Sequence, residues 1–214
     1  MPNLTVLDFT KMHFSTMPSS ICFLKNLRIL HMDLSVIKDI AIVAELRGFE
    51  VLSLSGSAIE ELPVEIGQLI QLKFLNLSDC TQLKLIRPHV LESLSRLEEL
   101  YLGNSFKQWE ANGLGNQRNA SLAELKDLHN LVALDVHACD VQLIPEDLFS
   151  ERLNRYKIFI GEVWNSWDSS FKSSKLLKLE LNTRITFDHS ICMLLKKTEL
   201  HVEKLKGVKN IYSS

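Results

Sequence analysis

The sequence predicts an α/β solenoid, a curved and right-handed stack of short repeating units with a parallel β-sheet on its concave face. Two observations predict this fold. Apolar residues recur in the order L-x-x-L-x-L, mostly at intervals of 22 to 25 residues. After each such stretch a second apolar pattern follows, and in several units proline introduces it. Units of about 20–29 residues with this pattern are leucine-rich repeats. We therefore expect short helices, 3-10 turns and loops on the convex face.

The repeats account for nearly the whole chain, so a single leucine-rich-repeat domain is predicted over residues 1–214. About eight units match the pattern and a ninth is irregular; they start near residues 4, 27, 49, 72, 97, 131, 153, 176 and 198. The interval from 97 to 131 is longer and contains a predicted insertion loop at about 106–120. Repeat arrays normally end in capping units with a polar outer face. Because both ends here would expose core leucines, we expect a fragment of a longer protein.

The period of two in a β-strand divides each unit between core and surface. The second and third apolar positions, such as Leu75 and Leu77, are expected to point into the core. The residues beside them, such as Phe74 and Asn76, are expected to face outward on the concave side. A small residue follows each strand where the chain turns inward, and we expect its side chain in the core. This slot holds Ser57, Cys80, Ser105 and Cys139.

The convex side is predicted from proline and capping signals. Proline is tolerated in the first turn of a helix because its φ is already helical. The stretch from Ser121 to Glu124 predicts a capping box that opens a helix through Leu125 and Leu128. The proline pattern occurs at Met17-Pro18, Leu62-Pro63 and Ile144-Pro145.

The outward concave positions are the candidate protein-binding residues. The first column of these positions is apolar over four units and then becomes charged, which favours docking of another protein on the apolar part. The alternative is that β-branched residues merely suit strands. The first column holds Val6, Ile29, Val51, Phe74, Glu99, Ala133, Arg155 and Lys178. The second column holds Asp8, His31, Ser53, Asn76, Tyr101, Asp135, Lys157 and Glu180, with His137 two residues beyond Asp135.

Three tryptophans outside the repeats are further candidates. Trp109 lies in the insertion, and Trp164 and Trp167 lie in an irregular, serine-rich stretch. Tryptophan is frequent among the residues that dominate binding energy at interfaces. It also fills gaps by packing against the body of a protein, so both interpretations stay open.

The sequence offers no sign of catalysis or of a bound cofactor. It has no glycine-rich phosphate loop and no pair of cysteines spaced for zinc. Asp135, His137 and Cys139 are spaced two residues apart, which would place a nucleophile and its base on one face of a continuous strand. Cys139 is expected to turn away into the core, so this interpretation is disfavoured. We therefore expect no enzyme, no cofactor and no metal in this chain.

Charge and targeting signals limit the partners and the compartment. A net charge of -2 gives no basic face for nucleic acid, and no apolar run is long enough for a membrane span. The first residues lack a secretory signal. Glycosylation sequons at Asn3, Asn76 and Asn119 would suggest secretion, but such tripeptides are common by chance. A cytoplasmic protein with free thiols is expected.

The repeats resemble those of plant intracellular disease-resistance proteins. This resemblance rests on the motif Leu62-Pro63-x-x-Ile66-Gly67-x-Leu69-x-x-Leu72-x-x-Leu75-x-Leu77-Ser78-x-Cys80. The later repeats are similar to those of the coiled-coil class of these receptors, and the resemblance covers essentially the whole chain. The stretches that carry it are Asn119–Leu125, Arg155–Gly161 with Trp164 and Trp167, Leu177–Asn182, Leu194–Glu199 and Leu205–Asn210.

The resemblance implies a protein-binding repeat module of an intracellular immune receptor. It implies recognition of a pathogen effector or of a modified host protein, and restraint of the receptor's own nucleotide-binding domain. That domain and the coiled coil are absent from this chain, so ATP or ADP is implied only for the missing part. The alternative is a generic intracellular leucine-rich-repeat scaffold or adaptor unrelated to immunity.

Overall fold

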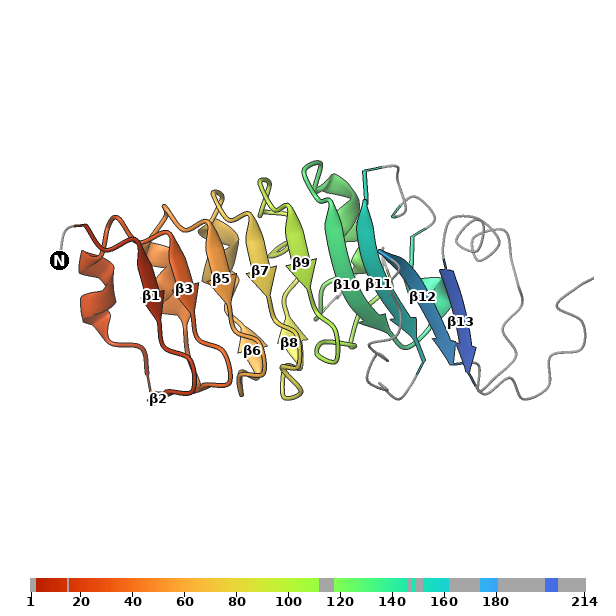
Figure 1. The fold of residues 1–214 in the computed structure, drawn as a ribbon, viewed down its shortest axis with the longest axis horizontal. Coiled ribbons are helices and arrows are strands. Elements are labelled where there is room, and N and C mark those ends of the chain that lie inside the picture. The colour runs from red at the N-terminus through yellow and green to blue at the C-terminus, as the bar shows by residue number, and fades with distance from the viewer. Residues whose placement is uncertain are drawn as a thin grey trace, which may run out of the picture.

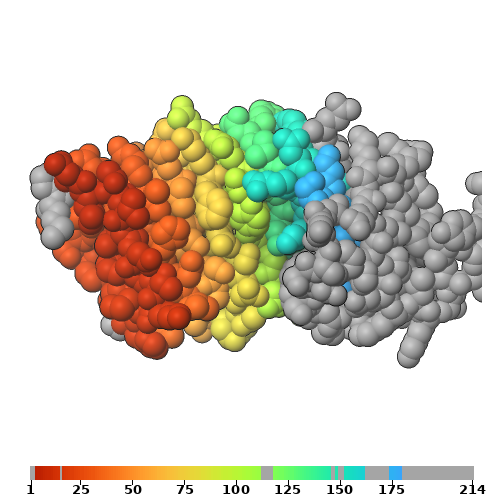
Figure 2. All heavy atoms as spheres, viewed as in Figure 1, coloured from red at the N-terminus to blue at the C-terminus, as the bar shows by residue number. Residues whose placement is uncertain are grey.

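A computed structural model of the chain describes residues 3–14, 16–111, 118–145, 148, 152–161, 174–180 and 199–203. Over these residues the predicted solenoid is confirmed. One strand from each unit joins a parallel sheet of nine strands, in the order β1-β3-β5-β7-β9-β10-β11-β12-β13. Figure 1 shows these strands side by side along the long axis, and Figure 2 shows the units as successive bands. The strands are β1 (Val6–Asp8), β3 (Ile29–His31), β5 (Val51–Ser53), β7 (Phe74–Asn76), β9 (Glu99–Tyr101), β10 (Ala133–Ala138), β11 (Arg155–Ile160), β12 (Lys175–Glu180) and β13 (Glu199–Glu203).

The convex side of the described residues is built from 3-10 helices and short strand pairs. Pro18 and Pro63 precede the first and third of these helices, as the proline pattern predicts, and their carbonyl oxygens accept hydrogen bonds from Ile21 N and Ile66 N, both at 3.0 Å. The helices are η1 (Ser19–Phe23), η2 (Ala41–Glu45), η3 (Val64–Gln68), η4 (Leu122–Asp127) and η5 (Val141–Leu143). The short strands are β2 (His13–Phe14) with β4 (Val36–Ile37), and β6 (Glu61–Leu62) with β8 (Leu85–Ile86).

The capping box at Ser121 is confirmed. Ser121 Oγ accepts a hydrogen bond from Ala123 N at 3.2 Å, and Glu124 Oε1 accepts one from Ser121 N at 3.1 Å. Two backbone donors at the start of the helix are satisfied in this way. The helix that follows is η4, a 3-10 helix that ends at Asp127.

Equivalent leucines stack between the sheet and the convex side to form the core. Leu30, Leu52, Leu75 and Leu100 are paired in register across β3, β5, β7 and β9, and all are fully buried. Burial of each such side chain contributes on the order of 1.5–3 kcal/mol. No unit could bury its leucine alone, so each unit depends on its neighbours.

A left-handed residue follows the strand in each of the first five units. These residues have φ between 51° and 67°, a range that costs a side-chain-bearing residue about 1–2 kcal/mol. The conformation turns the chain toward the convex side and aims an amide at the next unit: Leu34 N, for example, donates to Ser55 O at 2.7 Å. The residues are Lys11, Leu34, Gly56, Asp79 and Asn104.

The geometry changes at β10, where the strands lengthen from three residues to six. One prediction is wrong for this reason. In the shorter units the chain turns directly after the strand, which buries Cys80. In β10 the strand alternation continues to the buried Ala138, so the next residue, Cys139, is exposed instead of entering the core.

The register predicted for β12 is also wrong. The repeat pattern aligns Lys178 with Arg155, but Lys178 pairs with Phe159, four residues further along β11. Leu177 and Leu179 fill the core positions, and the closely spaced leucines of this strand fit the repeat pattern in more than one register. Because the slip is an even number of residues, Lys178 stays on the concave side.

Candidate protein-binding surface

The first concave column is an apolar row over four neighbouring strands. Val6, Ile29, Val51 and Phe74 are partners in register across β1, β3, β5 and β7. Val6 is 47% exposed and the other three are partly exposed. Neighbouring strands lie about 4.8 Å apart, so the four side chains form a continuous apolar strip. The Phe74 ring contacts the Tyr101 ring, with centroids 5.5 Å apart.

Beyond Phe74 the column becomes charged and its polar groups pair with one another. Arg155 Nη2 lies 2.9 Å from Glu99 Oε1, and the Tyr101 hydroxyl donates a hydrogen bond to Glu99 Oε2 at 2.5 Å. Burial of the phenol, followed by the neighbouring Glu99 carboxylate, raises the pKa of Tyr101 to about 12. Ala133, between Glu99 and Arg155, is buried. The charged part of the concave face is therefore organised around Glu99.

The second column begins with polar residues that hold the turns after the strands. Asp8 is exposed, and its Oδ1 accepts a hydrogen bond from Thr10 N at 2.8 Å; the hydrogen bonds from Thr10 lower the pKa of Asp8. Asn76 Oδ1 accepts one from Ser78 N at 3.0 Å. His31 is partly exposed between them.

Ser53 in this column is a correction to the predicted contact set. It is only 3% exposed, and its hydroxyl donates to Asp33 Oδ1 at 2.6 Å. The same carboxylate oxygen accepts from Ser55 N at 2.8 Å. Ser53 therefore stabilises the turn after the preceding strand instead of facing a partner.

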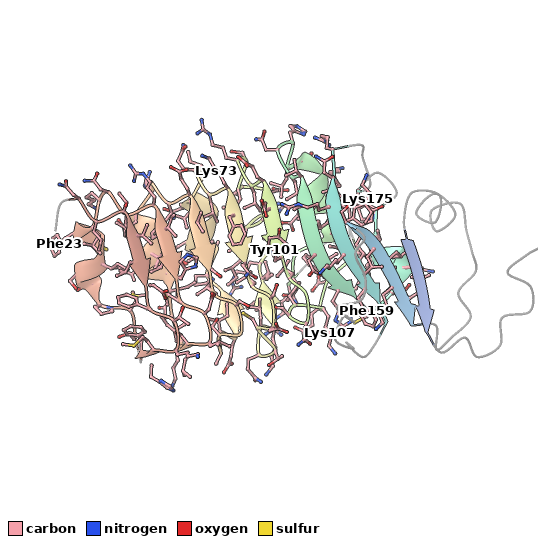
Figure 3. All side chains as sticks on the ribbon, viewed as in Figure 1. Phe23, Lys73, Tyr101, Lys107, Phe159 and Lys175 are labelled. Carbon is pink, nitrogen blue, oxygen red and sulfur yellow. The ribbon has the colours of Figure 1, made fainter. Side chains whose placement is uncertain are left out.

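A pocket opens on the concave face at β9, β10 and β11. Its volume is about 330 Å³. Figure 3 shows Tyr101 on β9 at the middle of the sheet, beside the strand that carries Asp135. Arg155 and Lys157, both exposed, come from β11. The lining residues are Tyr101, Ala133, Leu134, Asp135, Arg155, Tyr156, Lys157 and Ser174.

Asp135 is the most unusual residue of this pocket. Its Oδ1 is buried and has no hydrogen-bond partner among the described residues. The carboxylate lies over Gly103, where an added Cβ would be 2.8 Å from Oδ2 and 2.9 Å from Oδ1. Burial raises the pKa of Asp135 to about 7, with Lys157 opposing the shift and Asp79 adding to it. The sequence pattern placed Asp135 on this face, but it gave no signal for the role of Gly103.

The sequence pattern predicts that His137 and Lys178 are accessible to a partner, but the structure buries both. His137 is 2% exposed and its Nε2 lies 2.8 Å from Gly161 O. Lys178 is 4% exposed, with Nζ 5.8 Å from the centre of the Phe159 ring, a cation–π contact. The Phe159 and His137 rings meet edge to face at 4.7 Å. Phe159 is not among the predicted residues, because the two predicted columns end at Lys157 on this strand and β11 continues to Ile160.

Trp109 belongs to the core. It is 5% exposed, and its ring meets Phe106 edge to face with centroids 4.8 Å apart. The packing interpretation therefore describes Trp109 better than a role as an exposed anchor. Trp164, Trp167 and the side chain of Glu180 lie outside the described residues.

The described residues meet the requirements for neither a metal site nor a membrane-spanning helix. Within the described residues, no group of three or more His, Cys, Asp or Glu side chains could hold a metal ion. None of the helices in that part of the chain has the length and apolar character needed to cross a membrane.

The sequence of the chain is similar to part of a plant protein. The chain is 26% identical over 166 residues to Disease resistance protein At4g27190 of Arabidopsis thaliana. The match covers 75% of this chain and 17% of that protein, so the chain corresponds to a minor part of its relative. No protein-family model matches the sequence.

Solved structures show the same fold at low identity. The crystal structure of PEPR1-AtPEP1 matches with a TM-score of 0.61 and 17% identity, covering 83% of this chain and 26% of that one. Internalin C2 of Listeria monocytogenes matches with a TM-score of 0.52 and 23% identity, covering 74% of each chain. A leucine-rich-repeat protein of Leptospira interrogans has a TM-score of 0.51 and 21% identity, covering 92% of this chain and 60% of its own. The register of the sheet and these structures show that the chain is a leucine-rich-repeat solenoid, and its sequence is similar to part of a plant disease resistance protein.

Proposed function

We propose that this chain is the protein-binding repeat module of an intracellular plant immune receptor. In this role its concave face contacts a pathogen effector or a host protein, and it restrains the receptor's own nucleotide-binding domain. The observation that carries the proposal is the apolar strip of Val6, Ile29, Val51 and Phe74. A strip of apolar side chains over four strands is partly open to water, and contiguous exposed apolar surface marks interaction sites.

The polarity of the concave face supports two kinds of contact. The apolar strip fits a surface that stays bound, as the receptor's own domain would in the resting state. The polar pocket near Asp135 fits a contact that must be selective, because buried polar groups discriminate between partners. The sequence match to a disease resistance protein agrees with a protein ligand.

A cytoplasmic location is part of the proposal. Cys22, Cys80 and Cys139 form no disulfide within the described part of the chain, which agrees with a reducing compartment. The sequon at Asn119 is closed to glycosylation, because Asn119 is buried and its Oδ1 accepts a hydrogen bond from Ile86 N at 3.3 Å.

The test replaces Ile29 and Phe74 with lysine in a receptor that carries this chain. Lysine would place charges in the apolar strip, so we expect weaker association between the repeats and the nucleotide-binding domain and a higher resting activity. Val64→Lys is the matched control, because Val64 is apolar and 52% exposed but lies on η3, on the convex side. Co-precipitation of the two parts and the cell-death response without pathogen measure the two effects.

Thermal unfolding of each variant establishes that the fold is intact. Resting activity and domain association that remain as in the unsubstituted receptor would refute the docking role of the strip. An effect of Val64→Lys as large as that of Phe74→Lys would show that the concave face is not special.

A further inference from the structure

The concave pocket holds a carboxylate, that of Asp135, whose hydrogen bonding is incomplete among the described residues. Asp135 Oδ1 is buried and lacks a hydrogen-bond donor within the described part of the chain. Burying a polar group without a partner costs about 1–3 kcal/mol, and more for a charged group. Native proteins contain few such groups, and a functional role is one explanation for them.

Neither of the two neighbouring cations, Arg155 and Lys157, forms an ion pair with Asp135 among the described residues. Arg155 is committed to Glu99, at 2.9 Å. Lys157 is exposed, and no ion pair joins it to Asp135 among the described residues. On the other side, Gly103 leaves the space that the carboxylate occupies, and any side chain there would displace it. The site thus has an acceptor that is held in place and that lacks a donor among the described residues.

The shape of the pocket limits what could supply the donor. Its volume of about 330 Å³ lies at the lower end of the roughly 300–1,000 Å³ of small-molecule sites, which fits one long side chain. The ring of Tyr101 lines it, and an aromatic face attracts a cation. Tyr101 also touches Phe74, so a protein seated on the apolar strip would lie next to the pocket.

We propose that this pocket accepts a lysine or arginine side chain of the protein partner, whose charged nitrogen donates a hydrogen bond to the Asp135 carboxylate. The inference rests on the proposed function, because it names the partner chemistry of the same concave face. Hydrogen bonds between ions are about twice as strong as neutral ones, so the charge on the incoming group matters as well as its shape.

The test titrates the full chain with three small probes while backbone amide signals are followed by NMR. The probes are Nα-acetyl-arginine amide, the uncharged Nα-acetyl-citrulline amide of nearly the same shape, and the anionic Nα-acetyl-glutamate amide. We expect the arginine probe to shift the amides of Gly103, Asp135 and Lys157 and to bind about tenfold more tightly than the citrulline probe.

Asp135→Asn should reduce binding of the arginine probe to the level of the citrulline probe. Asp8→Asn is the matched control, because Asp8 is an exposed carboxylate on the same face, and it should leave binding unchanged. Gly103→Ala should weaken binding without removing the charge, since the new methyl group would displace the Asp135 carboxylate.

Three results would overturn the inference: equal binding of arginine and citrulline, tightest binding of the glutamate probe through Arg155 and Lys157, or no saturable shift with the arginine probe. None of these touches the proposed function. That function is tested separately by Phe74→Lys in the receptor, so the inference can fail while the docking role of the apolar strip stands.

Discussion

The indole Nε1 of Trp109 donates a hydrogen bond to the main-chain oxygen of His137, 2.9 Å away. Trp109 belongs to the insertion after β9, and His137 belongs to β10. The contact therefore fastens the insertion to the body of the solenoid where the strands lengthen from three residues to six. Ala120 N, at the other end of the insertion, donates to Ile86 O on β8 at 2.7 Å.

Two substitutions of Trp109 should separate the contribution of its packing to stability from the contribution of its hydrogen bond. Trp109→Ala should lower the free energy of unfolding by about 3–5 kcal/mol, the usual cost of emptying a buried aromatic site. Trp109→Phe should cost about 1–3 kcal/mol, because it keeps much of the ring but leaves the His137 oxygen without this donor. Urea unfolding measures both. Phe23→Ala, at an 81% exposed residue, should change stability little; a loss as small for Trp109→Ala would contradict the core role of the insertion.

Two glycines should respond differently to the same added methyl group. Gly56 has φ of 67°, and an added Cβ would lie 2.6 Å from Leu34 Cδ2. Gly56→Ala should therefore destabilise the chain by about 1–2 kcal/mol. Gly67, within η3, has only ordinary contacts, the nearest at 3.4 Å, so Gly67→Ala should be neutral or slightly stabilising. Thermal or urea unfolding of the two variants measures the difference in stability. Equal effects would argue that the left-handed turn at Gly56 does not cause the loss.

The raised pKa of Asp135 predicts a pH-dependent contribution to stability. Folding raises this pKa from 3.8 to about 7, so the folded chain holds the proton more tightly than the unfolded chain. The stabilisation from protonated Asp135 is then fully present below about pH 4 and lost as the pH rises to about 7. Asp79 strengthens this effect and Lys157 weakens it.

Asp135→Asn isolates this contribution, because asparagine cannot titrate. The free energy of unfolding of Asp135→Asn minus that of the natural chain should increase between pH 4 and pH 7 by on the order of 2 kcal/mol and stay level above. Urea unfolding at several pH values measures the difference. A difference that does not change with pH would show that Asp135 titrates like an exposed aspartate.

The thiols should differ in reactivity according to burial. Cys80 is buried, its Sγ donates to Leu54 O at 3.0 Å, and burial raises its pKa. Cys139 is exposed. Because the thiolate is the reactive form, iodoacetamide should label Cys139 readily in the folded chain and Cys80 only after denaturant is added. Mass spectrometry of the labelled peptides reads out both sites; early labelling of Cys80 would contradict its place in the core.

Much of the concave face could be predicted because it depends on local alternation alone. The row from Val6 to Phe74 follows from the strand period, and the structure places these residues in one register. Which of the outward residues remain accessible could not be predicted. Ser53, His137 and Lys178 have the same outward pattern, yet they are buried by contacts with residues distant in the sequence.

The solenoid follows from the sequence alone, since every unit repeats one apolar pattern that only stacking with its neighbours can bury. The capping box at Ser121 also follows from it, because the box needs only four adjacent residues. Only the three-dimensional arrangement shows where the strands lengthen, which register β12 takes, and that Asp135 lies over Gly103 with no donor to its Oδ1 among the described residues. These features depend on side chains that meet across units, and a pattern within one unit carries no information about the space its neighbour leaves.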